Sequence, residues 1–243
     1  MKLKNKRIVI TGGTSGVGYE MVKALYQENE LIVIARSKEK LKAQKSEYKD
    51  IITYQADLSN VVEVQRVGEE IAGRFEHIDI LINNAAVQNT PTFLEDNFSY
   101  NSISNEINLN FTAVCSLSYL LLPSLRHEEE AVILNINSGL GLSPKTNSAV
   151  YNATKGAINI FSQSLRYQLE STNIVVQQAF LQLVDTQMTK GRGKNKMTAK
   201  DACSSILDGV EKGILDNDIG KVKILRLLLR IAPSIVKKIM KKM

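Results

Sequence analysis

The chain has 243 residues, of which 44% are hydrophobic and 6% aromatic, and its formal net charge is +6. One large core is expected, while the scarcity of aromatic side chains and the lack of a recognised motif exclude a nucleic-acid partner. Cys115 and Cys203 lie in expected helices without a Cys-x-x-Cys pair or histidine cluster, which argues against a disulfide framework and a metal site. No apolar run approaches the ~20 residues that span a bilayer, and the basic N-terminus is no signal peptide, so we expect a cytoplasmic protein.

Short apolar runs alternate with longer segments of 3.6-residue period along most of the chain. The alternation is typical of a parallel sheet with helices on both faces, so we predict a single-domain α/β fold of the Rossmann type, with a doubly wound sheet. The expected strands lie at 8–10, 31–34, 51–54, 78–82, 132–136 and 174–176. The expected helices lie around 18–28, 38–47, 60–74, 104–125 and 149–171.

A glycine-rich loop follows the first expected strand and precedes the first expected helix. Glycines there allow a tight turn whose backbone N–H groups approach a pyrophosphate at the helix N-terminus. The spacing of Gly12, Gly16 and Gly18 differs from the usual G-x-G-x-x-G, and a merely flexible loop is the alternative. The residues predicted to contact the cofactor in this turn are Gly12, Thr14, Ser15, Gly16, Val17 and Gly18.

Tyr151 and Lys155 stand four residues apart in an expected helix, on one face and within reach of each other. A lysine cation near a phenol favours the phenolate, which makes the two residues a candidate acid/base pair, although a solvated helix face is the alternative. Ser138 precedes the tyrosine by thirteen residues, and Asn110 lies in the helix before it.

These residues occur together with the glycine loop and an Asn83-Asn84-Ala85-Ala86 run, in the order and at the spacings of one family. The chain resembles the classical short-chain dehydrogenase/reductase family over about residues 5 to 190. Within that family, residues 106–113 and 135–140 are most similar to the bacterial reductase-like proteins of the D-alanyl-lipoteichoic-acid operon.

The resemblance implies an NAD(P)-dependent oxidoreductase that transfers a hydride between nicotinamide and a carbonyl group or the matching alcohol. Tyr151 would protonate the carbonyl oxygen, and Lys155 would lower the pKa of Tyr151 and bind the nicotinamide ribose. Ser138 would orient the carbonyl oxygen, and Asn110 would hold a water that links Lys155 to solvent.

Further cofactor contacts follow from the same resemblance. Arg36 stands after the second strand, where an NAD site usually carries an acid, so we favour NADP(H) and keep NAD(H) as the alternative. The other expected contacts are Asp57 and Leu58 at the adenine, Asn84 and Ala85 at the ribose, and Val184 and Thr186 at the carboxamide.

The segment after the sixth strand departs from the family, because the usual Pro-Gly is missing between Gln178 and Thr186. This loss makes the path of the nicotinamide loop uncertain, and it supports an alternative function: a catalytically weak cofactor-binding protein that acts through partners or at the membrane surface. Glycine and lysine at 188–197 predict a mobile loop, either a substrate lid or an exposed basic segment.

Residues 221–243 carry eight Lys or Arg and no acid, so the whole positive surplus lies there. We divide the chain into a dinucleotide-binding unit, 1–220, and this basic amphipathic extension, with a short strand expected at 221–225 and helical turns on both sides of Pro233. Such helices can lie on anionic lipid, which predicts peripheral contact with the inner membrane face. The alternative is that the apolar faces pack on the domain or on a second subunit.

The family commonly pairs through the long helices at 104–125 and 149–171, so we expect a homodimer, with a homotetramer as the alternative. Loops at 88–100, 140–148 and 186–198 are expected to set specificity, and they are partly apolar. They leave the identity of the carbonyl or alcohol substrate open.

Overall fold

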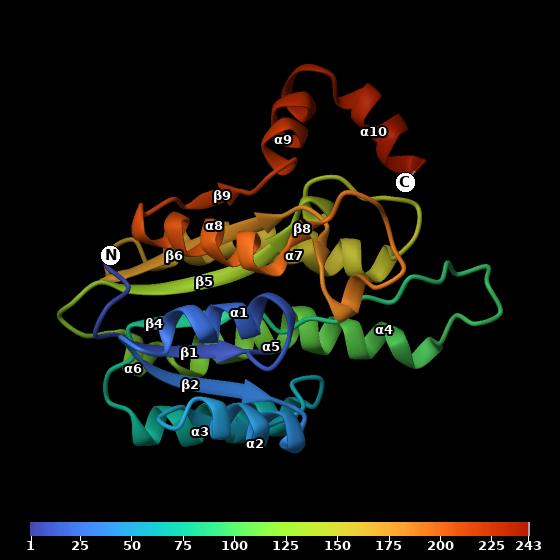
Figure 1. Ribbon diagram of the computed structural model, residues 1–243. Coiled ribbons are helices and arrows are strands. Elements are labelled where there is room, and N and C mark those ends of the chain that lie inside the picture. The colour runs from blue at the N-terminus through green and yellow to red at the C-terminus, as the bar shows by residue number, and fades with distance from the viewer. Residues whose placement is uncertain (243) are drawn as a thin grey trace.

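The computed structural model describes residues 1–242 and contains a seven-stranded parallel sheet (Figure 1). The strand order is β3-β2-β1-β4-β5-β6-β9, so the chain crosses from one side of β1 to the other between β3 and β4. This reversal defines a doubly wound sheet and confirms the predicted fold class. The strands are β1 (Arg7–Thr11), β2 (Glu30–Ala35), β3 (Ile52–Gln55), β4 (Ile80–Asn83), β5 (Ala131–Ser138), β6 (Ile174–Leu181) and β9 (Asp216–Asp218).

Helices cover both faces of the sheet, and each face has its own apolar core (Figure 1). One face is covered by α1 (Gly16–Leu25), α2 (Lys38–Glu47) and α8 (Ala199–Glu211). The other is covered by α3 (Val61–Arg74), α5 (Ala113–Leu120), α6 (Leu122–Leu125) and α7 (Ala149–Gln168). Along β1, Ile8 and Ile10 pack into the first core and Val9 into the second, because successive side chains of a strand point to opposite faces.

The core positions of β1 explain why the first apolar run forms a central strand. Ile8, Val9 and Ile10 are each 0% exposed. Burial of a side chain of this size contributes roughly 1.5–3 kcal/mol relative to full exposure. Two helices that pack on opposite faces of the sheet begin at polar caps. Ser37 accepts the N–H of Lys40 at the start of α2, and Asn60 accepts the N–H of Val62 at the start of α3. The strand and both helices therefore form where the sequence predicted them.

The expected long helix at 104–125 is interrupted. It consists of α4 (Tyr100–Ile107), a five-residue π-helical turn η1 (Asn108–Thr112), and then α5 and α6. The π turn carries Asn110, and such turns occur often at functional sites.

The end of the chain corrects one prediction. A strand was expected at 221–225, but the last strand is β9, and residues 222–241 form α9 (Val222–Ile231) and α10 (Pro233–Lys241). The helix prevails because it brings Val222 and Leu225, three residues apart, over Gly139, where an added Cβ would lie 3.2 Å from each side chain. Arg226, one residue later, forms an ion pair with Asp218 of β9. Within residues 1–242 no helix has the length and apolar content to cross a bilayer.

Candidate active site

The predicted site residues come from several segments of the chain and meet at the carboxyl ends of the parallel strands. Thr11 ends β1, Asn83 ends β4 and Ser138 ends β5. The N-terminus of α1 and that of α7 begin at the same edge. In open α/β sheets, ligands bind in the crevice at this edge, where the strand order reverses.

The glycine turn between β1 and α1 is as tight as the sequence predicts. Gly12 and Gly16 have φ of +67° and +56°, which side chains rarely tolerate. A Cβ on Gly18 would lie 2.3 Å from the Gly12 carbonyl oxygen and 2.6 Å from the Asn84 amide nitrogen. At the start of α1, Ser15 makes no side-chain cap, so the first N–H groups of the helix remain available to an anion.

The glycine turn is joined to the end of β4 by Thr11 and Asn84. The buried hydroxyl of Thr11 accepts the N–H groups of Asn84 at 2.9 Å and Ala85 at 3.0 Å. The Asn84 amide in turn donates to the carbonyl of Thr11 at 2.9 Å and that of Gly12 at 3.3 Å. These bonds hold the Asn83 to Ala85 segment beside the turn, as a shared ligand site requires.

The residues predicted near the adenosine lie at the ends of β2 and β3. Arg36 follows β2 and is exposed. Asp57 follows β3 and accepts both the N–H and the hydroxyl of Ser59, at 3.0 and 2.8 Å, while Leu58 is buried.

A contact that the sequence did not predict lies beside this region. The buried side chain of Gln44, on α2, donates a 2.8 Å hydrogen bond to the carbonyl of Gly13. Gln44 thereby holds the glycine turn in place from the neighbouring helix α2. No local sequence motif predicts this contact.

Tyr151, Lys155 and Ser138 form the chemical centre of the site. Tyr151 and Lys155 lie one turn apart on α7 and are 9% and 5% exposed. The Lys155 ammonium donates to the carbonyl of Ile136 on β5 at 2.7 Å and lies 5.8 Å from the Tyr151 ring centroid. The Ser138 hydroxyl lies near enough to the Tyr151 phenol to act on its pKa, and it accepts the N–H of Leu140 at 3.2 Å.

Burial dominates the pKa values of this pair. It raises the pKa of Tyr151 to about 12, although the nearby Ser138 hydroxyl opposes the shift, and it lowers the pKa of Lys155 to about 8. The expectation that Lys155 lowers the pKa of Tyr151 is therefore wrong for the protein alone. At neutral pH the phenol is protonated and the ammonium is charged.

Asn110 lies in the π turn and is 1% exposed. Its side-chain oxygen accepts the N–H of Val87, and its amide donates to the carbonyl of Val87, both at 2.9 Å. The amide also reaches the hydroxyl of Thr154, next to Lys155, at 3.3 Å. Asn110 therefore links Val87, just after the Asn83 to Ala86 segment, to the helix of Tyr151.

The loop that lacks Pro-Gly has a defined path. Strand β7 (Val184–Asp185) pairs in parallel with β8 (Met197–Thr198) and thereby anchors both ends of the segment. Thr186 begins a short 3₁₀ turn, η3 (Gln187–Thr189), and lies against Gly16: a Cβ there would be 3.1 Å from the Thr186 methyl group. Val184 is buried. The segment after β6 thus still passes beside the glycine turn, although it lacks the usual Pro and Gly.

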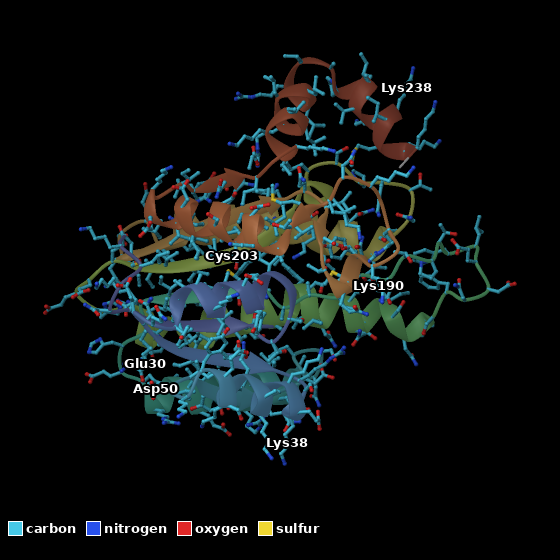
Figure 2. All side chains as sticks on the ribbon, in the orientation of Figure 1. Glu30, Lys38, Asp50, Lys190, Cys203 and Lys238 are labelled. Atoms are coloured by element: carbon cyan, nitrogen blue, oxygen red, sulfur yellow. The ribbon has the colours of Figure 1, made fainter. Side chains whose placement is uncertain are left out.

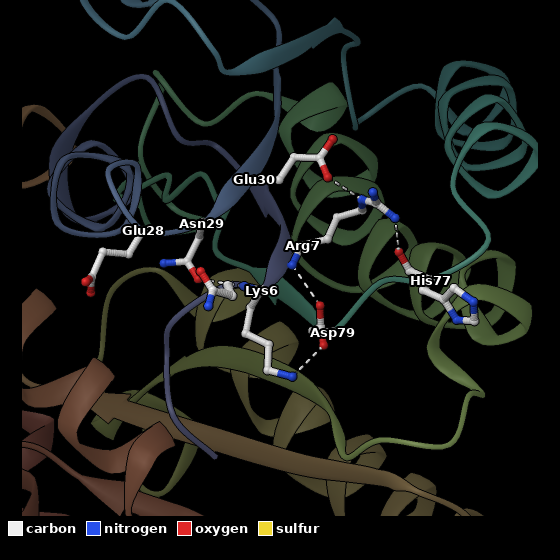
Figure 3. A pocket seen from close by; sticks show the side chains of 8 residues that line it. Lys6, Arg7, Glu28, Asn29, Glu30, His77 and Asp79 are labelled. Carbon is white, nitrogen blue, oxygen red and sulfur yellow. Dashed lines mark hydrogen bonds and ion pairs between the residues drawn. The ribbon is translucent and has the colours of Figure 1, made fainter.

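A depression of about 450 Å³ lies at the opposite, amino-terminal edge of the sheet (Figure 3). Its charged groups largely satisfy one another: Lys6 pairs with Asp79 at 2.9 Å, and Arg7 pairs with Glu30 and donates to the carbonyl of His77 at 2.8 Å. These groups join the strand starts, and the chemical centre lies at the other edge.

Comparison with known proteins agrees with this geometry. The sequence pattern of the short chain dehydrogenase family matches residues 6–197. The chain belongs to the short chain dehydrogenase family. The oxidoreductase DltE of Bacillus subtilis is 34% identical over 220 residues, which cover 88% of this chain and 87% of DltE. This similarity confirms the expected resemblance to the reductase-like proteins of the D-alanyl-lipoteichoic-acid operon.

More distant family members share the fold. The zebrafish very-long-chain 3-oxoacyl-CoA reductase-A is 32% identical over 77% of this chain, which spans only 60% of that protein's length. A short chain dehydrogenase from Burkholderia cenocepacia, solved with NADP, superimposes with a TM-score of 0.89 at 20% identity and 99% coverage of both chains. Solved relatives at this similarity include complexes with NADP and with NAD. The chain is an NAD(P)-dependent oxidoreductase of this family.

The residues present fit a nicotinamide dinucleotide. A pyrophosphate suits the uncapped N–H groups at the start of α1, where glycine at positions 12, 16 and 18 keeps side chains away from the turn. The Lys155 ammonium is 5% exposed and makes one hydrogen bond, to Ile136, among residues 1–242. An ammonium has three donors, so two remain for ribose hydroxyls.

Proposed function

We propose that this family member reduces a ketone or aldehyde, or oxidises the matching alcohol, with NADP(H). The observation that carries the proposal is the arrangement of Tyr151, Ser138 and Lys155 at the carboxyl edge of the sheet, beside a turn suited to a dinucleotide. The bound cofactor supplies or accepts the hydride.

The protein's own residues then control the proton and the carbonyl oxygen. Tyr151, with a pKa raised to about 12, holds its proton at neutral pH and donates it from the phenol to the carbonyl oxygen during reduction. Ser138 hydrogen-bonds the same oxygen and orients it. The Lys155 ammonium holds the ribose, and Asn110 fixes the α7 helix near a water that leads to solvent. Burial of Tyr151 and Lys155 excludes water from the transfer.

The cofactor contacts follow the positions described above. We assign the pyrophosphate to the α1 turn, the adenosine to the ends of β2 and β3, the nicotinamide ribose to the segment after β4 and to α7, and the carboxamide to the β7 loop. The residues of this assignment are Gly12, Thr14, Ser15, Gly16, Val17, Gly18, Arg36, Asp57, Leu58, Asn84, Ala85, Tyr151, Lys155, Val184 and Thr186.

NADP(H) is favoured over NAD(H) because Arg36 is exposed at the end of β2 and no acid occupies that position. The test is titration of the purified protein with NADPH and NADH, followed by nicotinamide fluorescence. Arg36→Gln is expected to weaken NADPH binding about tenfold and to leave NADH binding unchanged, because a charged hydrogen bond contributes ~1.5–3 kcal/mol. Lys42→Gln, an exposed charge on α2, is the matched control. No binding of either nucleotide would overturn the proposal.

The cofactor-binding alternative is not supported by the nicotinamide loop, because that loop keeps Thr186 against Gly16. We therefore retain the enzymatic function alone.

We further propose a homodimer that pairs through α4, α5 and α7. Tyr119, Ile160 and Tyr167 are 64–73% exposed on these helices, and an apolar groove lies between α4 and α7. Exposed apolar groups of this kind are typical of subunit interfaces. Sedimentation velocity should show a dimer for the wild-type protein and a monomer for Ile160→Asp. A homotetramer would require a second interface.

The extension at 221–243 is proposed to bind the cytoplasmic face of the membrane. Helices α9 and α10 project from the body of the dinucleotide-binding unit, 1–220, and Lys238 points outward (Figure 2). Ile224, Leu227 and Ile231 share one face of α9, and Ile235 and Ile239 share one face of α10; all five are 52–70% exposed. Arg226 pairs with Asp218, but the other cations of the extension form no ion pair within residues 1–242. Apolar side chains among such cations suit an anionic lipid surface, whereas two copies of this surface would repel each other.

Sedimentation with vesicles tests the membrane proposal. The protein should bind phosphatidylglycerol vesicles and not phosphatidylcholine vesicles. The double variant Ile235→Ser/Ile239→Ser should lose most of that binding, while Val61→Ser/Val62→Ser, an equally exposed apolar pair on α3, should retain it. Equal binding by both double variants would contradict the proposal.

A further inference from the structure

Two cations lie in different loops that are both hydrogen-bonded to the start of α7, the helix of Tyr151. Lys145 lies half-buried in the connection between β5 and α7, and Arg192 lies in the connection between η3 and β8. Burial and the charge of Arg192 lower the pKa of Lys145, and the charge of Arg192 also acts on the pKa of Tyr151. Both connections are at the carboxyl edge of the sheet, where a substrate carbonyl would meet the tyrosine.

Neither cation has a carboxylate partner within the part of the chain that the structure describes, residues 1–242. Among residues 1–242, the ion pairs formed by basic side chains involve neither Lys145 nor Arg192. Their neighbour Lys196 differs, since it pairs with Asp185 at 3.0 Å. The buried carboxyl group of Glu106 faces the same region, but it accepts the N–H of Asn89 at 2.8 Å, and burial raises its pKa. Within the described residues, the two positive charges at the mouth of the site are therefore not neutralised by an ion pair.

Arg192 is held in place by neutral partners. Its guanidinium donates to the side-chain oxygen of Gln88 at 2.9 Å, and the Gln88 amide donates to the hydroxyl of Ser148 at 3.2 Å. Ser148 is buried, has a φ of +59°, and immediately precedes α7, three residues before Tyr151. This chain of bonds ties the position of Arg192 to the catalytic helix and uses one of its five N–H donors. The other four N–H donors have no hydrogen-bond partner in residues 1–242, so the charged guanidinium can bind an anion.

Two like charges held together in a partly buried place favour a bound anion between them, because a carboxylate or phosphate satisfies both. We infer that Arg192 and Lys145 bind an anionic group, a carboxylate or phosphate, on the substrate whose carbonyl lies at Tyr151 and Ser138. This inference rests on the proposed reductase function and narrows its substrates to anionic ketones and aldehydes. The phosphates of the cofactor have a separate place, at the α1 turn and Arg36.

A binding experiment tests the anion site without turnover. Benzoate, phenyl phosphate and benzamide are titrated by calorimetry into the protein saturated with NADP⁺. We expect at least one of the two anions to bind about tenfold more tightly than benzamide, and the stronger of them to identify the preferred group. Arg192→Gln and Lys145→Gln should each remove most of this preference, whereas Lys194→Gln, an exposed charge in the same loop, should preserve it. Equal binding of all three compounds, or an equal loss in Lys194→Gln, would overturn the inference.

Measurements of turnover and of cofactor affinity distinguish an anion site for the substrate from a site for a cofactor phosphate. With NADPH, kcat/KM for 4-carboxybenzaldehyde should exceed that for benzaldehyde about tenfold, and Arg192→Gln should abolish the difference through KM rather than kcat. Failure to reduce either aldehyde would count against the proposed reductase, while the calorimetric result would still decide the anion site. If Arg192→Gln weakened NADP⁺ binding as strongly as benzoate binding, the anion would be a cofactor phosphate and the inference would be wrong.

Discussion

The Lys155 ammonium donates a 2.7 Å hydrogen bond to the backbone carbonyl of Ile136, two residues before Ser138 on β5. This bond fixes helix α7 against the end of the strand. Because Tyr151 lies one turn before Lys155 on the same helix, the bond also places the phenol beside Ser138. Lys155 thus positions the acid Tyr151 and faces the expected ribose site. Burial sets the pKa of its ammonium group.

The lowered pKa of Lys155 predicts a pH dependence of cofactor binding. Below about pH 8 the amine is protonated, and as the pH rises through that value the group loses its charge. NADPH affinity should therefore fall severalfold between about pH 7 and pH 9, well below the ordinary lysine range near 10.4. Fluorescence titration at each pH measures the step.

Lys155→Met supplies the control for that experiment. It should bind NADPH weakly at neutral pH and show no step near pH 8, because the titrating group is gone. A wild-type affinity that stayed constant across this range would refute the assignment of the step to Lys155.

The glycine turn makes a second prediction. A methyl group on Gly18 would lie 2.3 Å from the Gly12 carbonyl oxygen, so Gly18→Ala should distort the turn and weaken NADPH binding at least tenfold. Gly73→Ala is the matched control, since a Cβ there has no neighbour within 4 Å. Replacement of a helical glycine by alanine should stabilise the fold by about 0.5–1 kcal/mol and leave cofactor affinity unchanged. Similar affinities in the two variants would argue against the turn as the pyrophosphate site.

Thr11 offers a test of stability at the same edge. Thr11→Val leaves the partly buried N–H groups of Asn84 and Ala85 without their acceptor, and each lost partner costs about 1–3 kcal/mol. The free energy of unfolding, from urea titration, should fall by about 2–4 kcal/mol. Thr11→Ser keeps the hydroxyl and should cost only about 1 kcal/mol for the lost methyl group. If serine and valine were equally destabilising, the hydroxyl would not be the anchor.

Local patterns in the sequence were sufficient to predict the main elements of the fold. The apolar run at Ile8 to Ile10, the glycine turn and the four-residue spacing of Tyr151 and Lys155 each depend on neighbours in the chain, and the structure contains all three. The doubly wound sheet follows from the same alternation of strand and helix periods.

Features that depend on distant contacts were missed. Gln44 contacts Gly13 across 31 residues, and Arg192 contacts Gln88 across 104, so no local pattern marks either side chain. The raised pKa of Tyr151 arises from tertiary burial, which outweighs the opposing effects of Ser138 and Arg192. The strand prediction at 221–225 is wrong because Val222 and Leu225 lie on helix α9, where both side chains pack next to Gly139.

The most direct test of the account is NADPH consumption by the wild-type protein and by Tyr151→Phe, with a panel of aldehydes and ketones that includes carboxylated members. We predict measurable turnover by the wild type and a loss of about 10²–10⁴-fold in Tyr151→Phe, the range expected for removal of a general acid, with NADPH affinity nearly unchanged. Tyr119→Phe, which removes an exposed phenol, should behave as wild type. Retention of turnover by a folded Tyr151→Phe protein would contradict the assignment of the proton donor.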